Sequence, residues 1–301
     1  MHSALLARFI ESHPRLFVLT GAGCSTESGI PDYRDAEGNW KRSARPMTLQ
    51  AFMGDEDARR RYWARSLIGW QRIGAARPNV AHHALAQLQR QGRIEGLVTQ
   101  NVDGLHQAAG STAVIDLHGR IDRVRCMGCE RRADRAEHQQ SLLQRNPHWA
   151  ARLADHEAAL AADAASSRPD GDAELALAAG TSTGTGTDSG TGTGTNFEVP
   201  ASPACGGILK PDVVFFGESV PPARVEAARA HLRHADAILV VGSSLMLYSG
   251  YRFAQYAAEL GKPIAAINLG RTRADELLAL KVARSCAGSL AFVLAPPLRA
   301  A

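Results

Sequence analysis

Short apolar runs recur along the chain, and most of them end in glycine or a polar residue. They are RLFVLTGAG (15–23), GLVTQNVDG (96–104), AVIDLHG (113–119), PDVVFFGE (211–218), AILVVGSS (237–244) and PIAAINLG (263–270). Runs that are apolar throughout are typical of strands buried on both faces of a parallel sheet. Helical patterns at 81–92 and 249–261 lie between several of these runs. The alternation predicts an α/β fold, a Rossmann-like parallel sheet with covering helices.

Glycines follow the first run, at a place where such sheets bind ligands. Gly21 and Gly23 stand directly after the predicted strand and before a predicted helix. In this geometry backbone N–H groups and a helix N-terminus can bind a pyrophosphate. The signal is weak by itself, because Thr26 occupies the position of the third glycine in the dinucleotide-binding fingerprint. An ordinary turn explains this motif almost as well.

Polar side chains follow the next two runs. Gln100, Asn101 and Asp103 end the second run, and His118 stands between the third run and a glycine. The first three suit recognition of ribose hydroxyls and an amide, although for this segment taken alone a hydrogen-bonded loop capped by Asn and Asp is the favoured interpretation. His118 is placed to act as a general base near neutral pH, whereas a single histidine is more often structural.

Composition and charge narrow the choice of partners. The chain has 301 residues, 45% of them hydrophobic and 21% charged, enough for one large domain with an appended module. Its formal net charge of +4 comes without a long basic run, so we expect no nucleic-acid partner. No stretch approaches the ~20 apolar residues of a membrane span, and the N-terminus lacks the pattern of a signal peptide. We therefore expect no membrane partner and a cytoplasmic location.

The five cysteines indicate a metal site before disulfides, as is usual in a reducing compartment. Cys126 and Cys129 form a knuckle in RCMGCE whose spacing lets two thiolates bind one zinc ion. Such knuckles normally come in pairs, but FEVPASPACGG (197–207) supplies Cys205 alone. Upstream of it, residues 130–200 begin with a charged, Ala-rich helical pattern and continue into GTSTGTGTDSGTGTGTN (180–196). That tract has no apolar face to bury, and we expect a flexible loop there.

Seven segments together resemble the sirtuins, the NAD-dependent protein-lysine deacylases. They are GAGCSTESGIPDYR, TQNVDGLH, DLHG, RCMGC, ILKPDVVFFGE, GSSLMLYS and INLG, in the family's order, and the resemblance runs from about Phe9 to about Leu290. RYWARS, NPHW and PDGDAEL make the chain most similar to class II members. The resemblance implies a single sirtuin domain over 1–301. Its Rossmann-like NAD-binding part would comprise 1–34, 80–121 and 206–301, with a helical part at 35–79 and a zinc module at 122–205 that carries the low-complexity loop.

The resemblance also implies a role for each matching residue. The NAD-binding set would be Gly21, Ala22, Gly23, Thr26, Asp32, Tyr33, Arg34, Gln100, Asn101, Val102, Asp103, Gly242, Ser243, Ser244, Asn268, Leu269, Gly270 and Cys286. Val214, Phe215, Phe216 and Gly217 would pair with the substrate peptide as an added strand. His118 and Asn101 would be catalytic, and Cys126, Cys129 and Cys205 would bind structural zinc.

The implied reaction is a transferase-type deacylation, most simply deacetylation, of acylated lysine side chains of proteins. NAD loses nicotinamide, the amide oxygen joins the ribose carbon, and His118 then acts as base on a ribose hydroxyl. The products are free lysine, nicotinamide and O-acyl-ADP-ribose. Two alternatives stay open: a protein mono-ADP-ribosyltransferase that uses NAD, and a non-catalytic NAD-binding module.

Four further positions carry more specific expectations. Ser202 aligns with the missing zinc ligand, and a hydroxyl is a much poorer ligand than a thiolate. We expect a weakened site completed by water or by a residue such as His138, with a metal-free module as the next possibility. Tyr62 and Arg65 lie three apart, as in some sirtuins that bind acidic acyl groups, but a helix face packed by Trp63 is at least as good an interpretation. Cys24 is expected to fill space rather than to act as a nucleophile.

Overall fold

A computed structural model describes residues 2–41, 46–149 and 196–295. The predicted flexible loop at 180–196 lies outside the described residues, except for its last residue, Asn196. The part of the Ala-rich stretch that follows Trp149 also lies outside them. Within the described ranges, no helix is long and apolar enough to cross a membrane.

The larger of two sheets is parallel and has six strands, as the alternation of apolar runs predicts. The strands are β1 (Leu16–Thr20), β2 (Ile94–Thr99), β3 (Val114–Asp116), β7 (Ala237–Val241), β8 (Ile264–Ile267) and β9 (Leu280–Val282). Their order across the sheet is β3-β2-β1-β7-β8-β9. Five of the six apolar runs each contribute one strand of this sheet. The remaining strand, β9, was not predicted because its three residues are too few to form a recognisable hydrophobic pattern.

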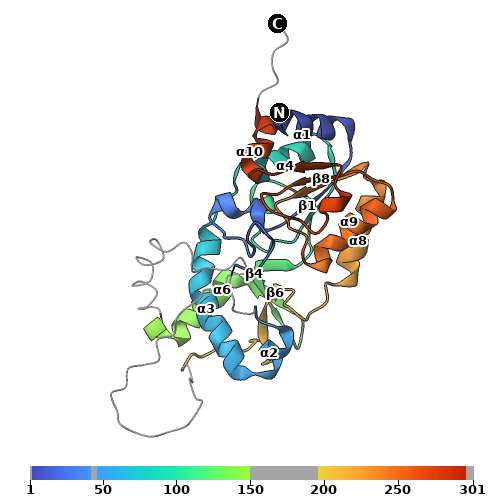
Figure 1. The fold of residues 1–301 in the computed structure, drawn as a ribbon. Helices are drawn as coiled ribbons and strands as arrows, with labels where there is room; N and C mark the ends of the chain where they lie inside the picture. Colours follow the sequence, from blue (N-terminus) through green and yellow to red (C-terminus); the bar gives the residue numbers. More distant parts are fainter. Residues whose placement is uncertain (1, 42–45, 150–195, 296–301) are drawn as a thin grey trace.

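Helices cover both faces of this sheet (Figure 1). On one face lie α1 (His2–Ser12), α4 (Val80–Arg90) and α10 (Cys286–Leu290), and on the other lie α8 (Pro222–His234) and α9 (Tyr248–Glu259). Strand β1 is buried on both sides, because Leu16 and Val18 pack into the first layer while Phe17 and Leu19 pack into the second. This is why its sequence is apolar throughout rather than alternating. Helices α4 and α9 confirm the patterns at 81–92 and 249–261.

The strand order reverses between β1 and β7. From β1 the chain builds outward through β2 and β3, and it later returns to the other side of β1 to build β7, β8 and β9. In open α/β sheets this switch point leaves a crevice beyond the carboxyl ends of the strands, where ligands bind. The segments that follow β1, β2 and β7 therefore meet at one place.

A second, smaller sheet shows that one predicted strand was assigned to the wrong sheet. It has three antiparallel strands in the order β5 (Arg132–Asp134), β4 (Gly119–Cys126) and β6 (Leu209–Val213). The remaining apolar run, PDVVFFGE (211–218), supplies the last three residues of β6. This run therefore does not belong to the parallel sheet, and the Rossmann-like part does not begin at 206. The pattern could not tell the two sheets apart, because an edge strand that packs on one layer can also be apolar. Pro211 is consistent with the edge position, since proline cannot donate to a central ladder.

Helices pack beside the small sheet and complete the lower part of the molecule in Figure 1. They are α2 (Leu49–Gly54), α3 (Glu56–Ala75) and α6 (Arg135–Arg145). A separate hydrophobic core forms there. It includes Phe52, Tyr62 and Trp63 from the helices and Val213 and Phe215 from β6 and the loop that follows it. The short elements are α5 (Leu105–Ala108) and the 3-10 turns η1 (Ala22–Cys24), η2 (Thr26–Ser28), η3 (Asp275–Leu277) and η4 (Ala291–Leu294).

Candidate functional site at the switch point

The glycine loop after β1 does not lead into an α-helix, which corrects the expectation for Gly21 and Gly23. It forms two successive 3-10 turns, η1 and η2, instead. The second turn ends at Gly29 in the left-handed conformation, and Pro31 follows shortly after. Both features prevent a helix from continuing. Any phosphate bound here would therefore meet the N–H groups of a turn rather than the end of a long helix dipole.

Gly242 lets the loop after β7 pack directly against the glycine loop. Its φ is +65°, and a Cβ at this position would overlap the backbone nitrogen of Cys24. Gly23 N–H donates to the Gly242 carbonyl across the same contact, at 2.8 Å. Only glycine combines the left-handed conformation with so close an approach. The backbones that follow β1 and β7 thus form one continuous rim at the switch point.

The polar residues after β2 hold the glycine loop in place. Asn101 Nδ2 donates to the Gly21 carbonyl at 3.0 Å and to Ser25 Oγ at 2.9 Å. Ser25 Oγ donates in turn to Asp103 Oδ2 at 2.7 Å. Burial raises the pKa of the Asp103 carboxyl, although the Leu105 N–H and the Ser25 hydroxyl oppose that shift. Gln100 Nε2 reaches the other loop and donates to Ser243 Oγ at 2.8 Å.

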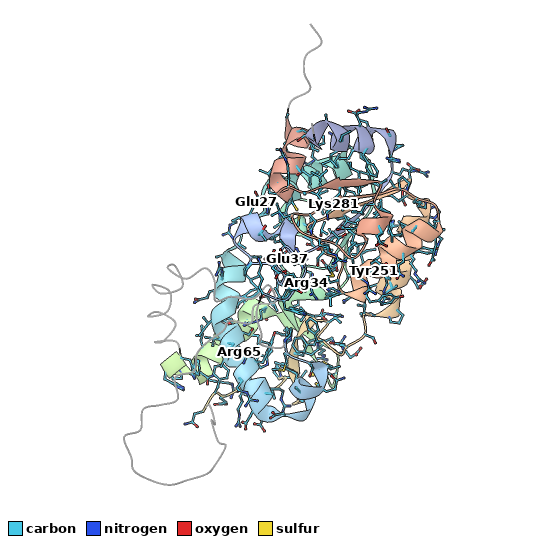
Figure 2. All side chains as sticks on the ribbon, viewed as in Figure 1. Glu27, Arg34, Glu37, Arg65, Tyr251 and Lys281 are labelled. Atoms are coloured by element: carbon cyan, nitrogen blue, oxygen red, sulfur yellow. The ribbon has the colours of Figure 1, made fainter. Side chains whose placement is uncertain are left out.

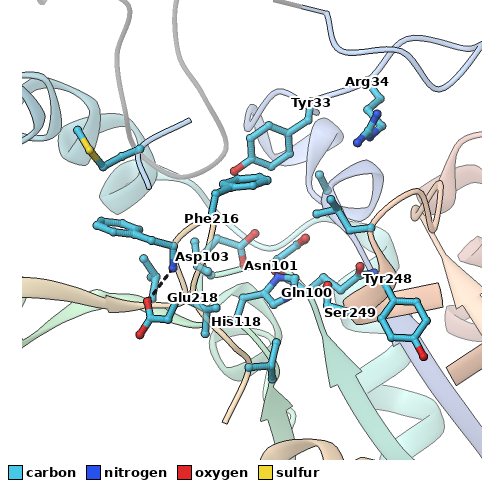
Figure 3. Close-up of a pocket in the computed structure, with 18 of the residues that line it drawn as sticks. Tyr33, Arg34, Gln100, Asn101, Asp103, His118, Phe216, Glu218, Tyr248 and Ser249 are labelled. Atoms are coloured by element: carbon cyan, nitrogen blue, oxygen red, sulfur yellow. Dashed lines mark hydrogen bonds between the residues drawn. The ribbon is translucent and has the colours of Figure 1, made fainter. Parts of the chain in front are cut away.

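His118 follows β3 and faces the same crevice (Figure 3). Its Nδ1 lies 2.8 Å from the Gln100 carbonyl, which can only accept, so Nδ1 carries the proton. Nε2 is then an acceptor, and it lies 3.0 Å from the Ser249 hydroxyl. Burial lowers the pKa of His118 to about 4. At pH 7 the ring is therefore neutral, and it presents a lone pair at the end of the crevice.

Two adjoining cavities open at this place, with volumes of about 410 Å³ and about 290 Å³. The larger one is lined by Gly21, Ala22, Gly23, Thr26, Asp32, Tyr33, Arg34, Gln100, Asn101, Gly242, Ser243, Ser244, Asn268, Leu269, Gly270 and Cys286. The smaller one is lined by Val102, Asp103, Val214, Phe215, Phe216 and Gly217. Residues shared by both are Ala22, Tyr33, Arg34, Gln100, Asn101, His118 and Leu247. The structure thus brings every expected NAD and peptide residue to one crevice, with His118 at its middle.

Aromatic side chains close one side of the smaller cavity. Trp40 lies between Tyr33 and Phe216, with ring centroids 5.7 and 5.8 Å away. The Arg34 guanidinium stacks 4.3 Å above the Trp40 ring. Residues 214–218 follow strand β6 as a loop, in which Phe215 N–H donates to Glu218 Oε2 at 2.9 Å. The apolar walls suit a lysine stem or an acyl chain better than a second charged group.

Several cavity residues were not singled out from the sequence. Ser249, the partner of His118 Nε2, is the most important of them, and it lies inside the quoted GSSLMLYS segment. Tyr62 and Arg65 show the opposite outcome. Tyr62 is buried against Phe52 and Phe215 and does not line the cavity, and Arg65 lies on α3 in the lower part of Figure 2, away from Arg34. The packed helix face was therefore the correct interpretation, and this pair offers no site for an acidic acyl group.

The three expected zinc ligands come together beside the small sheet. One sulfur each from Cys126, Cys129 and Cys205 lies within 4.8 Å of the others, and Cys126 Sγ and Cys205 Sγ are 3.4 Å apart. The Cys129 N–H and the Ser202 hydroxyl lower the pKa of Cys126 to about 6, a preference for the thiolate that zinc requires. Ser202 is buried and hydrogen-bonds to Cys126, at the place where a fourth ligand would stand. The donor set fits one zinc ion held by three thiolates, with a hydroxyl in the fourth position.

His138 is not the fourth ligand, which corrects that expectation. Its ring packs edge-on against Trp63, with centroids 4.4 Å apart, inside the core beside α3. Among the described residues, the group of close sulfur and nitrogen atoms at the zinc site does not include it. His138 lies in the first turn of α6, and the sequence pattern did not indicate which face of this helix would be buried.

The fold and the two cavities define an α/β protein whose switch point holds a crevice of a kind that binds dinucleotides, beside a second, apolar cleft. Comparison with known proteins agrees. The family model described as Sir2 matches residues 21–249. A Xanthomonas campestris pv. campestris (strain 8004) protein named NAD-dependent protein deacetylase is 62% identical over 97% of this chain and 91% of its own length. Bradyrhizobium diazoefficiens NAD-dependent protein deacetylase 2 is 59% identical over 96% of both.

A solved structure of a Sir2 protein has the same fold. The Sir2 complex with a p53 peptide and NAD+ superposes with a TM-score of 0.69 at 25% identity, covering 98% of both chains. The chain belongs to the Sir2 family.

Proposed function

We propose that this protein is an NAD-dependent protein-lysine deacylase, most simply a deacetylase, that yields free lysine, nicotinamide and O-acyl-ADP-ribose. The single observation that carries the proposal is the neutral His118, whose Nε2 faces the junction of the two cavities. A base is useful there only if the reacting atoms of two different substrates meet at that junction. The names of the bacterial relatives support this choice.

The larger cavity is the proposed NAD site. The N–H groups of the turn after Gly21 and of the rim at Gly242 would bind the phosphates, while Asn268 and Cys286 would lie at the adenosine end. NAD supplies a ribose carbon that becomes reactive toward an amide oxygen once nicotinamide has left. Asn101 and Asp103, fixed by Ser25, would hold the nicotinamide and ribose end beside His118.

His118 is the proposed general base. The Gln100 carbonyl fixes the proton on Nδ1, so Nε2 can accept a proton from a ribose hydroxyl that takes the place of the Ser249 hydroxyl. Ser249 can then donate to the ring nitrogen before the substrate arrives and keep the ring oriented. Asn101 is proposed as the second catalytic residue, since its amide lies at the shared wall of the two cavities.

The smaller cavity is the proposed site of the acylated lysine of a protein substrate. Residues 214–217 form its edge, and the backbone is fixed on one side because Val214 N–H donates to the His118 carbonyl at 2.8 Å. A peptide strand could pair with the other side through main-chain groups alone, which tolerates many sequences. We also propose a cytoplasmic location, because all five cysteines are free thiols, as a reducing compartment maintains them.

Mass spectrometry of peptides that carry different acyl-lysines, incubated with enzyme and NAD, tests the proposal. The wild type should release free lysine and O-acyl-ADP-ribose in equal amounts. His118→Ala should lower the rate by ~10² or more, the usual effect of losing a general base, while NAD still binds. His148→Ala, which replaces an exposed histidine outside both cavities, is the matched control. ADP-ribose attached to protein without an acyl-lysine requirement would instead support the transferase alternative.

A further inference from the structure

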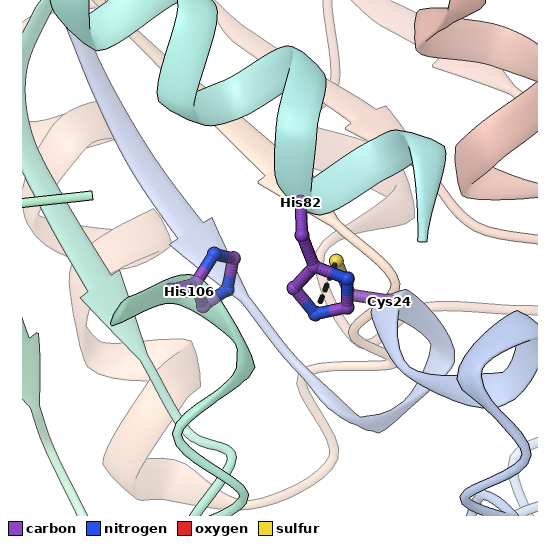
Figure 4. A group of neighbouring side chains, drawn as sticks. All are labelled: Cys24, His82 and His106. Atoms are coloured by element: carbon purple, nitrogen blue, oxygen red, sulfur yellow. Dashed lines mark hydrogen bonds between the residues drawn. The ribbon is translucent and has the colours of Figure 1, made fainter. Parts of the chain in front are cut away.

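A buried group of soft metal ligands lies beneath the glycine loop and has no role in the proposed reaction. Cys24 is on η1, His82 is on α4 and His106 is on α5, and all three are at most 1% exposed (Figure 4). Each offers one sulfur or nitrogen atom, and the three atoms lie within 4.8 Å of one another. Cys24 Sγ is 4.0 Å from His82 Nε2, and the two imidazole centroids are 4.8 Å apart.

His106 has a ring nitrogen that is ready to bind a metal. Its Nε2 lies 2.9 Å from Thr20 Oγ1, and Thr20 already donates its own hydroxyl proton to Thr99 Oγ1. His106 therefore donates from Nε2, and Nδ1 carries a lone pair. This Nδ1 is buried and has no hydrogen-bond partner among the described residues. A buried acceptor without a partner is unfavourable, and a bound cation would remove that penalty.

We infer that Cys24, His82 and His106 form a second metal site, which takes a borderline-soft divalent ion of the Zn²⁺ class. Two imidazoles and one thiolate are ligands that zinc prefers, and the fourth position is left for water. Zinc–ligand distances of about 2.0–2.3 Å place tetrahedral donor atoms about 3.3–3.6 Å apart. Since the three atoms now lie within 4.8 Å of one another, they need to approach by no more than about 1.5 Å.

The protonation states set what binding requires. Burial lowers the pKa of His82 to about 4 and that of His106 to about 3, so both rings are neutral at pH 7. Burial raises the pKa of the Cys24 thiol, so the ion must displace that proton. His82 Nδ1 now accepts from Asn79 N–H at 3.3 Å, a bond that is lost when Nε2 binds metal and Nδ1 takes the proton. Asn79 keeps its side-chain bond to Ala81 N–H at the start of α4.

The site is coupled to the NAD cavity through Ser25, the neighbour of Cys24. Ser25 Oγ lies 3.5 Å from His82 Nε2 and holds both Asp103 and Asn101. Metal binding takes His82 Nε2 away from Ser25 and draws Cys24 toward α4. The glycine loop has little room to follow, because its backbone is packed against Gly242. An ion in the site therefore weakens NAD binding, and by linkage NAD weakens binding of the ion.

Zinc titration of three proteins tests the inference. They are the wild type, Cys24→Ser, which keeps the size of the side chain but replaces the thiol, and His83→Gln, which replaces an exposed histidine beside His82, outside the group and outside both cavities. Zinc per chain is measured after gel filtration, and the Kd for NAD is measured by calorimetry with and without added Zn²⁺. We expect the wild type and His83→Gln to retain one more zinc per chain than Cys24→Ser. Zinc should raise their Kd for NAD about fivefold or more, and should leave that of Cys24→Ser unchanged.

His106→Asn provides a second variant should Cys24→Ser fold poorly, and it should lose the same equivalent of zinc. Equal zinc retention in the wild type and in folded variants of both ligands would overturn the inference. So would a wild type whose only bound zinc disappears with Cys126→Ser. Retention of the extra zinc without any change in the Kd for NAD would overturn the coupling. The stoichiometry does not depend on deacylation, so failure of the proposed function would leave this result unaffected.

Discussion

Acid should destabilise this protein through His138, a histidine that is buried as a neutral ring. His138 is 5% exposed and packs against Trp63. Burial, helped by the positive charge of Arg135, lowers its pKa to about 3. In the unfolded chain its pKa is about 6.5. As the pH falls below 6.5, the unfolded state therefore takes up a proton that the folded state cannot accept.

The size of the effect follows from the difference between the two pKa values. The stabilising contribution of the neutral ring is complete above pH 6.5 and falls by up to ~1.4 kcal/mol for each pH unit below it. Between pH 7 and pH 5 the loss is ~2 kcal/mol, and it continues until the pH approaches about 3, where the folded state begins to bind the proton as well. Since domains of this kind are stable by only ~5–15 kcal/mol, one histidine has a measurable effect.

Urea unfolding of the wild type and His138→Phe at several pH values, with zinc fixed, measures this effect. The phenyl ring can keep the packing against Trp63 but cannot titrate. Relative to the wild type, the free energy of unfolding of His138→Phe should rise by ~2 kcal/mol from pH 7 to pH 5. Any constant packing difference cancels in this comparison. His83→Gln, which replaces an exposed histidine, should show no such rise. Parallel curves for the wild type and His138→Phe would refute the reasoning.

Three further substitutions test other parts of the structure. Ser202→Cys should complete a four-thiolate zinc site, so that the variant keeps zinc longer against a chelator and melts at a higher temperature only when zinc is present; equal retention would show that Ser202 is not at a ligand position. Gly242→Ala should weaken NAD binding by more than tenfold, measured by calorimetry, because its Cβ would overlap the Cys24 backbone at a φ of +65°. Lys210 is buried, and its Nζ donates to the Val213 carbonyl and to Glu218 Oε2. Lys210→Met should therefore loosen residues 214–218 and raise the KM for peptide more than the Kd for NAD; equal changes in both constants would contradict this.

The sequence predicted the parallel sheet well because strands that are buried on both faces have apolar residues at consecutive positions. Strand β1 is apolar from Leu16 to Leu19 because each of these side chains enters one core or the other. Strand β6 shows the limit of the same reasoning. The apolar run that begins within it, PDVVFFGE (211–218), resembles the other runs, yet β6 pairs with β4, because a pattern of burial does not specify which sheet provides the neighbour.

The residues of the site that directly follow strands could be predicted from the sequence. The residues that are brought together by the packing of helices could not be predicted in this way. Gln100, Asn101 and His118 follow strands of one parallel sheet, so their convergence could be expected from topology. The group around Cys24 could not, since His82 lies in the first turn of α4 and the buried side of this helix is decided by tertiary contacts. The burial of His138 against Trp63 is another such case.

The position of His118 between the two sheets links the two substrates in the proposed reaction. Strand β3 of the parallel sheet ends at Asp116, and β4 of the small sheet begins at Gly119. Gly119 makes that turn at a φ of +85°, where a Cβ would overlap the Asp212 carbonyl at the end of β6. The backbone of His118 is therefore fixed to the peptide side through Val214, and its ring is fixed to the NAD side through Gln100. Any movement of the small sheet relative to the large one must move the base against one substrate or the other. Substitutions at this turn should accordingly lower kcat even when both substrates still bind.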